Sequence, residues 1–273
     1  QLAKNNISEN SSIIFKRFEW IKRNRNNNNL NNLNLSISSD NPLLNHWFDK
    51  AEDKAVVKKI SLNEKLNNGK NSNWSYWSNG DVSIGSYHGK SNALGVSLEK
   101  PKDIFTNGIS FGADKKNSEN NYSGYALRYA DGKSKFVNSG DSTTMDTLSL
   151  NYYFITPLKD NGHTNTVVGL SSLKYDLKSG GIVTGERIGK QLFTSIDFRN
   201  DDEYSNLNLT PSFKLKSSLT ELSEFTEFMT NASSNGTNVV YGKESFFIGD
   251  MAAGILFNSD PYKYANSIIS HNG

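Results

Sequence analysis

The segment 207–219, LNLTPSFKLKSSL, alternates between apolar and polar residues more clearly than any other part of the chain. Leu209 and Phe213 fall on one parity. Ser212 and Lys214 fall on the other. Because successive side chains of a β-strand point to opposite faces, this segment has one apolar face and one polar face. A chain built from such segments is predicted to form a sheet whose two faces meet different surroundings.

Seven further segments show the same period of two, although Phe193 interrupts one of them. Gly-rich and polar stretches separate the segments, which is typical of antiparallel strands joined by turns. The sequence therefore predicts an all-β, antiparallel fold with about eight visible strands. The seven further segments are 74–87, 109–113, 124–130, 147–154, 165–175, 191–199 and 245–257.

The composition excludes several classes of protein. The chain of 273 residues has no Cys, which excludes a disulfide framework, a Cys-based zinc site and a Cys nucleophile. Its 30 basic residues nearly balance its 28 acidic residues, so we expect no nucleic-acid partner. The mean hydropathy of −0.60 excludes a bundle of membrane helices, because each such helix needs ~20 consecutive apolar residues. A membrane β-barrel remains compatible, since only alternate residues of its strands are apolar.

The predicted connections between the strands alternate between short and long. Bacterial membrane barrels have this asymmetry, with short periplasmic turns and longer outer loops. Alternating strands are nevertheless more common in soluble sandwiches and barrels, so both interpretations stay open at this point. The short connections are 115–121, 158–163 and 200–205, and the long ones are 88–105, 133–144, 176–189 and 228–242.

The first 72 residues differ in composition from the rest and are dominated by Asn, Lys and Ser. Such a tract buries little apolar surface and is predicted to be extended or mobile. The island Ser11–Arg25 is different: Ile14, Phe18 and Ile21 follow one helical face, with basic residues toward its end. We predict a helix there, with Ser11 or Ser12 as its N-cap. A weaker helical pattern covers 49–60.

No motif predicts an enzyme. The pattern G-x-S-x-G occurs at 108–112, but Ser110 lies inside an alternating strand, whereas a nucleophile elbow needs a strand–turn–helix. The four His residues lie far apart and lack the spacing of metal ligands. We therefore expect no catalytic site, no cofactor site and no metal site.

The order of the parts carries a resemblance to a known family. A basic amphipathic helix and a polar linker precede NWSYWSNGDVSIGSYHG at 73–89 and GISFGADKK at 108–116. The most specific block is 207–228, where an alternating strand containing LTP runs into a segment containing FTE. Over roughly 11–257 the chain resembles the C-terminal translocator domain of autotransporters, the type V secretion proteins of Gram-negative outer membranes. Supporting blocks are SGYALRYADG at 123–132, LSLNYYF at 148–154, GLSSLKYDL at 169–177 and GERIGKQLFTSIDFR at 185–199.

The resemblance implies a transmembrane β-barrel of twelve strands, of which about eight are visible here, with an α-helix in the lumen. It implies a luminal helix and Asn-rich linker over 1–72 and a barrel domain over 73–273, truncated at its C-terminus. The helix would join the barrel to an N-terminal passenger, and its basic residues would face acidic groups such as Asp114, Asp197 and Asp250. The family's C-terminal aromatic residue is absent. The first residue is Gln rather than Met and no apolar segment of a signal peptide lies near it, so we expect sequence to be missing on both sides.

These interpretations assign three sets of residues. The luminal helix contributes Ile14, Lys16, Arg17, Phe18, Ile21, Lys22, Arg23 and Arg25. The lumen-facing set is Ser110, Gly112, Asp114, Arg128, Asp197, Arg199, Thr210, Ser212, Lys214 and Lys216. The lipid-facing set is Ile109, Phe111, Tyr125, Leu127, Tyr129, Leu148, Leu150, Tyr152, Phe154, Leu207, Leu209, Phe213 and Leu215.

The function implied is a non-enzymatic translocator of the bacterial outer membrane that displays its passenger at the cell surface. Its expected partners are the covalently linked passenger, outer-membrane lipid and lipopolysaccharide, and the outer-membrane assembly machinery. Two alternatives stay open: an outer-membrane adhesin or surface enzyme that uses the loops 133–144, 176–189 and 228–242, and a soluble secreted β-protein. Dependence on detergent separates the membrane proteins from the soluble one.

Overall fold

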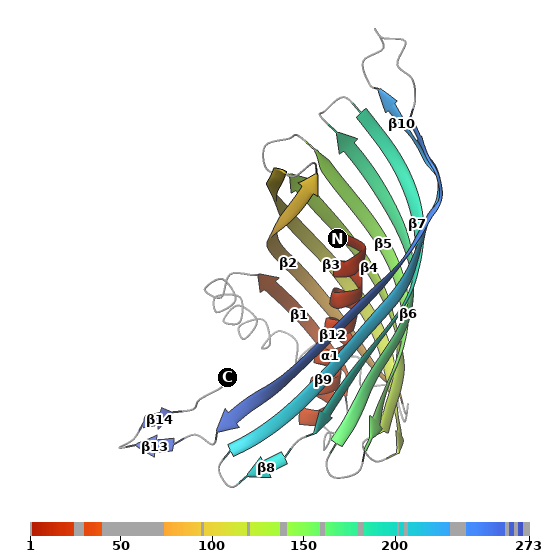
Figure 1. The fold of residues 1–273 in the computed structure, drawn as a ribbon. Coiled ribbons are helices and arrows are strands. Elements are labelled where there is room, and N and C mark those ends of the chain that lie inside the picture. Colours follow the sequence, from red (N-terminus) through yellow and green to blue (C-terminus); the bar gives the residue numbers. More distant parts are fainter. Residues whose placement is uncertain are drawn as a thin grey trace.

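One long antiparallel sheet and one N-terminal helix make up the fold (Figure 1). The computed structural model describes residues 2–24, 30–39, 74–93, 96–118, 121–136, 141–158, 162–179, 183–200, 202–204, 207–229, 239–259, 262–264 and 267–269. The predicted all-β class with one N-terminal helix is confirmed. The weaker helical pattern at 49–60 and Arg25 lie outside the described residues.

All eight predicted strands are present, and each is longer than its alternating pattern indicated. They are β2 (Trp74–Ala93), β3 (Val96–Ser118), β4 (Asn121–Phe136), β5 (Ser142–Pro157), β6 (Gly162–Ser179), β7 (Val183–Asn200), β9 (Leu207–Leu222) and β12 (Glu244–Ser259). Short strands complete the set: β1 (Asn32–Ser39), β8 (Asp202–Tyr204), β10 (Phe225–Met229), β11 (Val239–Tyr241), β13 (Tyr262–Tyr264) and β14 (Ser267–Ile269).

Sequential neighbours pair antiparallel from β2 to β7, and then β7 pairs with β9 and β9 with β12. At the other end, β1 pairs with β2 in parallel. Among the described residues, no pairing joins β12 to β1 or β2, so the sheet curves strongly but stays open. Figure 1 shows this curvature, with the helix on the concave side.

Three of the four long connections predicted from the sequence, 88–105, 133–144 and 176–189, are mostly strand where the structure describes them. Most of the fourth, 228–242, lies outside the described residues. Strands β2 and β3 pair from Trp74↔Lys115 as far as Ala93↔Val96, so most of 88–105 belongs to a hairpin. Segment 228–242 contains β11, which pairs with β10. The prediction of long loops at 88–105, 133–144 and 176–189 was wrong because polar, weakly alternating residues still form ladder hydrogen bonds when a neighbouring strand continues. The two ends of the sheet are called here the turn end, at 119–120, and the hairpin end, at 94–95.

Helix α1 (Leu2–Arg23) begins earlier than predicted and contains Ser11 in its middle. Its first half is rich in Asn and Ser, which are poor helix formers. That half is buried all the same, because Leu2, Ala3 and Ile7 pack on the sheet. Tertiary packing therefore outweighs local propensity. Among the described residues, no helix combines the length and the apolar character needed to cross a membrane.

Candidate functional site: the concave face filled by helix α1

Helix α1 runs along the concave face from the hairpin end to the turn end of the sheet. Near its start, Leu2 and Ala3 pack with Met145 and Leu173. Near its end, Phe18 lies edge-on to Tyr153, with ring centroids 5.4 Å apart. Both helix ends thus make apolar contacts with the concave face, and polar contacts with that face occur along the length of the helix.

Arg17 forms a buried ion pair with the wall strand β3. Its Nε lies 2.7 Å from Asp114 Oδ2 and its Nη2 lies 2.9 Å from Asp114 Oδ1, with both side chains almost fully buried. Tyr153 donates a hydrogen bond of 3.2 Å to Asp114 and accepts one of 2.7 Å from the Trp77 indole. A bidentate ion pair of this kind fixes the rotation of the helix about its own axis as well as its position on the sheet.

A second buried cation, Arg128 of β4, is paired with carboxylates on two sides. Its guanidinium contacts Asp81 of β2, and its Nη2 lies 3.1 Å from Glu9 of the helix. Glu9 also accepts a hydrogen bond from Thr106. Only 1% of the Arg128 side chain is exposed, and a buried charge is tolerated only with such compensation.

In the N-terminal half of the helix, side-chain amides form hydrogen bonds between α1 and the concave face of the sheet. Asn6 donates to Gln191 Oε1 at 3.0 Å and to Ser171 at 3.2 Å. Asn151 donates to Asn10 Oδ1 at 3.1 Å. Buried polar groups need hydrogen-bond partners. These hydrogen bonds can form only when the helix lies at one position along the sheet.

The predicted lumen-facing residues lie on the concave side of the sheet where their side chains are described. Ser110, Asp114, Arg128 and Asp197 are each at most 1% exposed. A Cβ at Gly112 would fall on the Trp77 ring, so only glycine leaves room for that indole. Ser212, Lys214 and Lys216 are half-buried, as is Arg199, and the side chain of Thr210 lies outside the described residues.

The basic residues of α1 do not all reach the acidic groups expected for them. Arg17 meets Asp114, but Asp197 pairs with Arg199 of its own strand at 2.8 Å. Asp250 pairs with Lys4, which lies outside the helix predicted from the sequence. Of the other predicted helix residues, Ile14, Phe18 and Ile21 are buried, Lys16 and Arg23 are exposed, and Lys22 is half-buried.

The convex face is apolar over a broad band. Tyr125 and Tyr152 pair across β4 and β5 with ring centroids 5.1 Å apart, and Phe198 and Phe213 pair across β7 and β9 at 6.2 Å. Phe154 and Leu215 are half-buried, and the side chains of Leu207 and Leu209 lie outside the described residues. The exposed members of the predicted lipid-facing set are Ile109, Phe111, Tyr125, Leu127, Tyr129, Leu148, Leu150, Tyr152 and Phe213.

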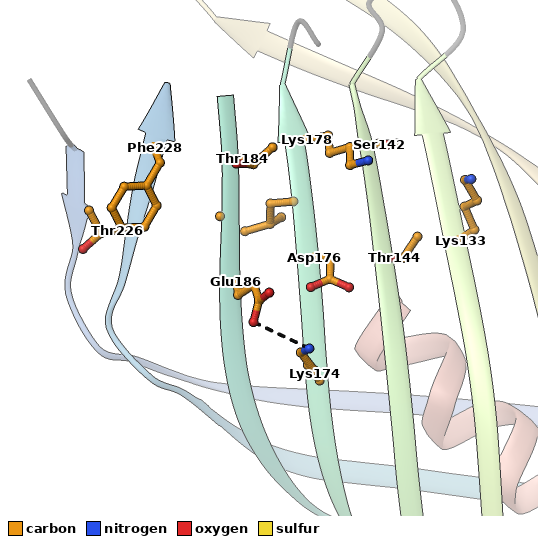
Figure 2. A pocket seen from close by; sticks show the side chains of 12 residues that line it. Lys133, Ser142, Thr144, Lys174, Asp176, Lys178, Thr184, Glu186, Thr226 and Phe228 are labelled. Atoms are coloured by element: carbon orange, nitrogen blue, oxygen red, sulfur yellow. Dashed lines mark ion pairs between the residues drawn. The ribbon is translucent and has the colours of Figure 1, made fainter. Parts of the chain in front are cut away.

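The apolar band ends in charged residues toward the hairpin end. A hollow of about 720 Å³ lies there, between β4, β5, β6, β7 and β10. Figure 2 shows its lining residues, Lys133 and Lys178 among them. Lys174 and Glu186 lie 3.6 Å apart and are both more than half exposed. Exposed pairs of this kind add little stability. The hollow therefore marks the polar border of the convex face.

Comparison with known proteins decides the family. A model of the autotransporter beta-domain matches residues 76–245. The chain belongs to the autotransporter beta-domain family. No curated protein matches the sequence. Among solved structures, the translocator domain of autotransporter NalP from Neisseria meningitidis aligns with a TM-score of 0.55 and 13% identity, over 81% of this chain and 80% of that one.

The beta domain of the Bordetella autotransporter BrkA aligns at 17% identity with a TM-score of 0.49, over 72% of this chain and 74% of that one. The match to the NalP translocator domain supports the fold. The family match includes strands β3 to β7 and β9 in full.

Sequence analysis of this autotransporter domain missed several residues of the site. Glu9, Asn6 and Asn10 lie in the half of α1 that was not predicted to be helical. Phe193, which seemed to break the pattern of β7, is 1% exposed and belongs to the core around the helix. A large aromatic residue on the otherwise small, polar face of a strand was the signal that could have located the helix contact.

Proposed function

We propose that this chain is the outer-membrane translocator of an autotransporter, which exports an N-terminal passenger and anchors it at the cell surface. The observation that carries the proposal is the contrast between the two faces of one sheet. The convex face exposes aromatic and aliphatic side chains, whereas the concave face holds buried charges and amides against a single helix. A lipid-exposed wall around a polar interior has this distribution.

The lengths of the elements fit a membrane. Helix α1 has 22 residues, which at 1.5 Å per residue gives ~33 Å, close to the ~30 Å of a bilayer core. Strands β2 to β7 have 16 to 23 residues, whereas ~9–11 tilted residues span a bilayer. In this proposal the excess length projects from the membrane at the hairpin end.

The remaining assignments follow from that placement. The exposed convex residues face lipid, the buried concave residues face the lumen, and α1 lies in the lumen as the connection to the passenger. Residues 1–72 form the helix and linker, with β1 of the linker added along β2, and residues 73–273 form the barrel domain. The partners are the passenger, outer-membrane lipid with lipopolysaccharide, and the outer-membrane assembly machinery. The domain transports and anchors, and it has no catalytic role.

Surface display of a tag tests the function. The chain is expressed in a Gram-negative host behind a signal peptide, with an epitope tag placed directly before Gln1. Protease added to intact cells is expected to remove the tag while the barrel stays in the outer-membrane fraction. A matched strain carries the same tag at Ser118, at the turn end, where it should stay protected. A protected N-terminal tag on an outer-membrane-inserted barrel would refute export.

A further inference from the structure

An apolar pocket of about 250 Å³ lies on the concave face at the start of helix α1. Most of its lining side chains are aliphatic or aromatic, and Tyr175, Leu177, Leu222 and Phe246 in its wall are only half-buried. The strands that form the wall, β5, β6, β7, β9 and β12, pair with one another in series. The pocket therefore does not depend on how the two ends of the sheet meet.

The pocket lies about one helical turn beyond Leu2, toward the hairpin end. Leu2 packs with Met145 of β5 and Leu173 of β6, whereas Thr143 and Tyr175, which line the pocket, are each two residues closer to the hairpin end. Two residues along a strand advance about 6.7 Å, and one helical turn advances about 5.4 Å. The pocket thus faces the position of the residues that precede Leu2 in a helix continued in the same direction.

The chemistry of the pocket suits an apolar side chain. Arg187, the one cation among the described residues that line it, donates to the carbonyl oxygens of Ser223 at 2.8 Å and Gly242 at 3.0 Å and to Glu244 at 3.0 Å. Its charge is therefore engaged at the base of strands β10 and β11. An apolar cavity of about 150 Å³ accommodates a molecule the size of benzene, so this pocket has room for one large aliphatic or aromatic side chain.

The first turn of α1 lacks the residues that stabilise the start of a helix. It contains no acidic residue, and Lys4 places a cation near the positive end of the helix dipole. Leu2 and Ala3 are strong helix formers, but their side chains cannot cap the first N–H groups. These residues suit the interior of a longer helix better than its N-terminus.

We propose that this pocket holds a Leu, Ile, Met or Phe side chain from the segment directly before Gln1, which continues α1 and joins it to the passenger. The second residue before Gln1 supplies this side chain. It lies three positions before Leu2 and four before Ala3, so it shares their face of the helix. The inference rests on the proposed function, which takes a passenger to precede Gln1, and it adds a docking site for the end of that passenger.

Hydrogen exchange of α1 tests the docking. Two chains carry extensions of the same composition before Gln1. Ala-Ala-Leu-Ala puts the Leu at the second position before Gln1, and Leu-Ala-Ala-Ala puts it at the fourth, on the opposite side of the helix. Exchange of the backbone amides of residues 4–10 is measured by mass spectrometry on the folded protein in detergent. Burial of the Leu side chain is expected to slow this exchange about tenfold in the first chain relative to the second.

Substitutions in β6 show whether the side chain enters this pocket. Leu177→Asn replaces an aliphatic side chain of the wall and should abolish the difference in exchange between the two extended chains. Lys178→Asn is the matched control, because Lys178 is the next residue of β6 and is exposed on the other face of the sheet. This control should preserve the difference.

Equal exchange in the two extended chains, or a difference that survives Leu177→Asn, would overturn the docking site. A charged residue at the second position before Gln1 in the complete precursor would overturn it as well. None of these results affects surface display of the N-terminal tag, so failure of the inference is distinguishable from failure of the proposed function.

Discussion

At the scale of single residues, the Arg17–Asp114 pair is the contact on which the position of the helix depends most. Both partners are buried, and Asp114 also accepts a hydrogen bond from Tyr153. Removing one partner of a buried pair costs ~3–5 kcal/mol, because the other charge stays behind without compensation. Arg17→Met is therefore expected to destabilise the domain by about that amount in reversible urea unfolding from lipid vesicles.

The double variant R17M/D114N is the control for that prediction. It removes both charges together, so its cost should be smaller than the sum of the two single variants. Strictly additive losses would show that the two side chains do not stabilise one another.

The two faces of β9 provide a second prediction at this scale. Phe213 is 42% exposed on the convex face, and its neighbour Ser212 points to the concave side. An Arg in a lipid-facing mid-membrane position costs ~2–4 kcal/mol, whereas a polar interior accepts the charge. Phe213→Arg should thus lower the unfolding free energy far more than Ser212→Arg. Equal losses in the same vesicle unfolding assay would refute the lipid assignment of Phe213.

Residue parity was predictable from the sequence because it depends only on the period of a strand. The ion-pair partners of the buried charged side chains could not be predicted from the sequence. Glu9 and Asp81 meet at Arg128 although 47 residues separate Asp81 from Arg128 and 119 separate Glu9 from it. No local sequence pattern predicts these contacts, because they depend on the register of three strands and on the position of the helix along the sheet.

At the scale of elements, the helix and the strand ends show where local reasoning fails. The apolar stripe Ile14, Phe18 and Ile21 located the second half of α1 correctly. Its first half has a weak helical sequence and is stabilised by Leu2, Asn6 and Ile7 against the sheet. Likewise, the ends of β2 and β3 were taken for a loop because their composition is polar, although they pair throughout. Contacts between distant segments extend both elements beyond their local signal.

The start of α1, which leads to the proposed passenger, lies at the hairpin end of the sheet, so the proposed export places that end outside the cell. Ser118 is exposed at the turn end, and Ser179 is exposed at the hairpin end. If the turn end faces the periplasm, an impermeant thiol reagent added to whole cells should label Ser179→Cys and spare Ser118→Cys. Permeabilised cells, in which both sites react, give the reference for full labelling. Labelling of Ser118→Cys alone in whole cells would reverse the orientation.

At the scale of the whole molecule, one sheet separates an apolar exterior from a polar interior that holds a helix. The sequence alone predicted the strands, the two faces and the presence of a helix, because each leaves a periodic signature. It did not predict that β12 pairs only with β9 among the described residues, nor the pairing of β1 along β2, because both depend on which strands meet over long distances. The proposed translocator requires that the helix fill the interior, and this is the central claim of the account.

The conductance of the barrel in planar bilayers tests that claim most directly. With α1 present, the inserted domain is expected to pass little current, since the helix packs against β4, β5 and β6 in the interior. Deleting residues 1–30 should raise the single-channel conductance by removing the helix. A deletion of equal length over 40–69 retains α1 and should leave the conductance low. Unchanged conductance after deletion of 1–30, in a barrel shown to be folded and inserted, would contradict the account.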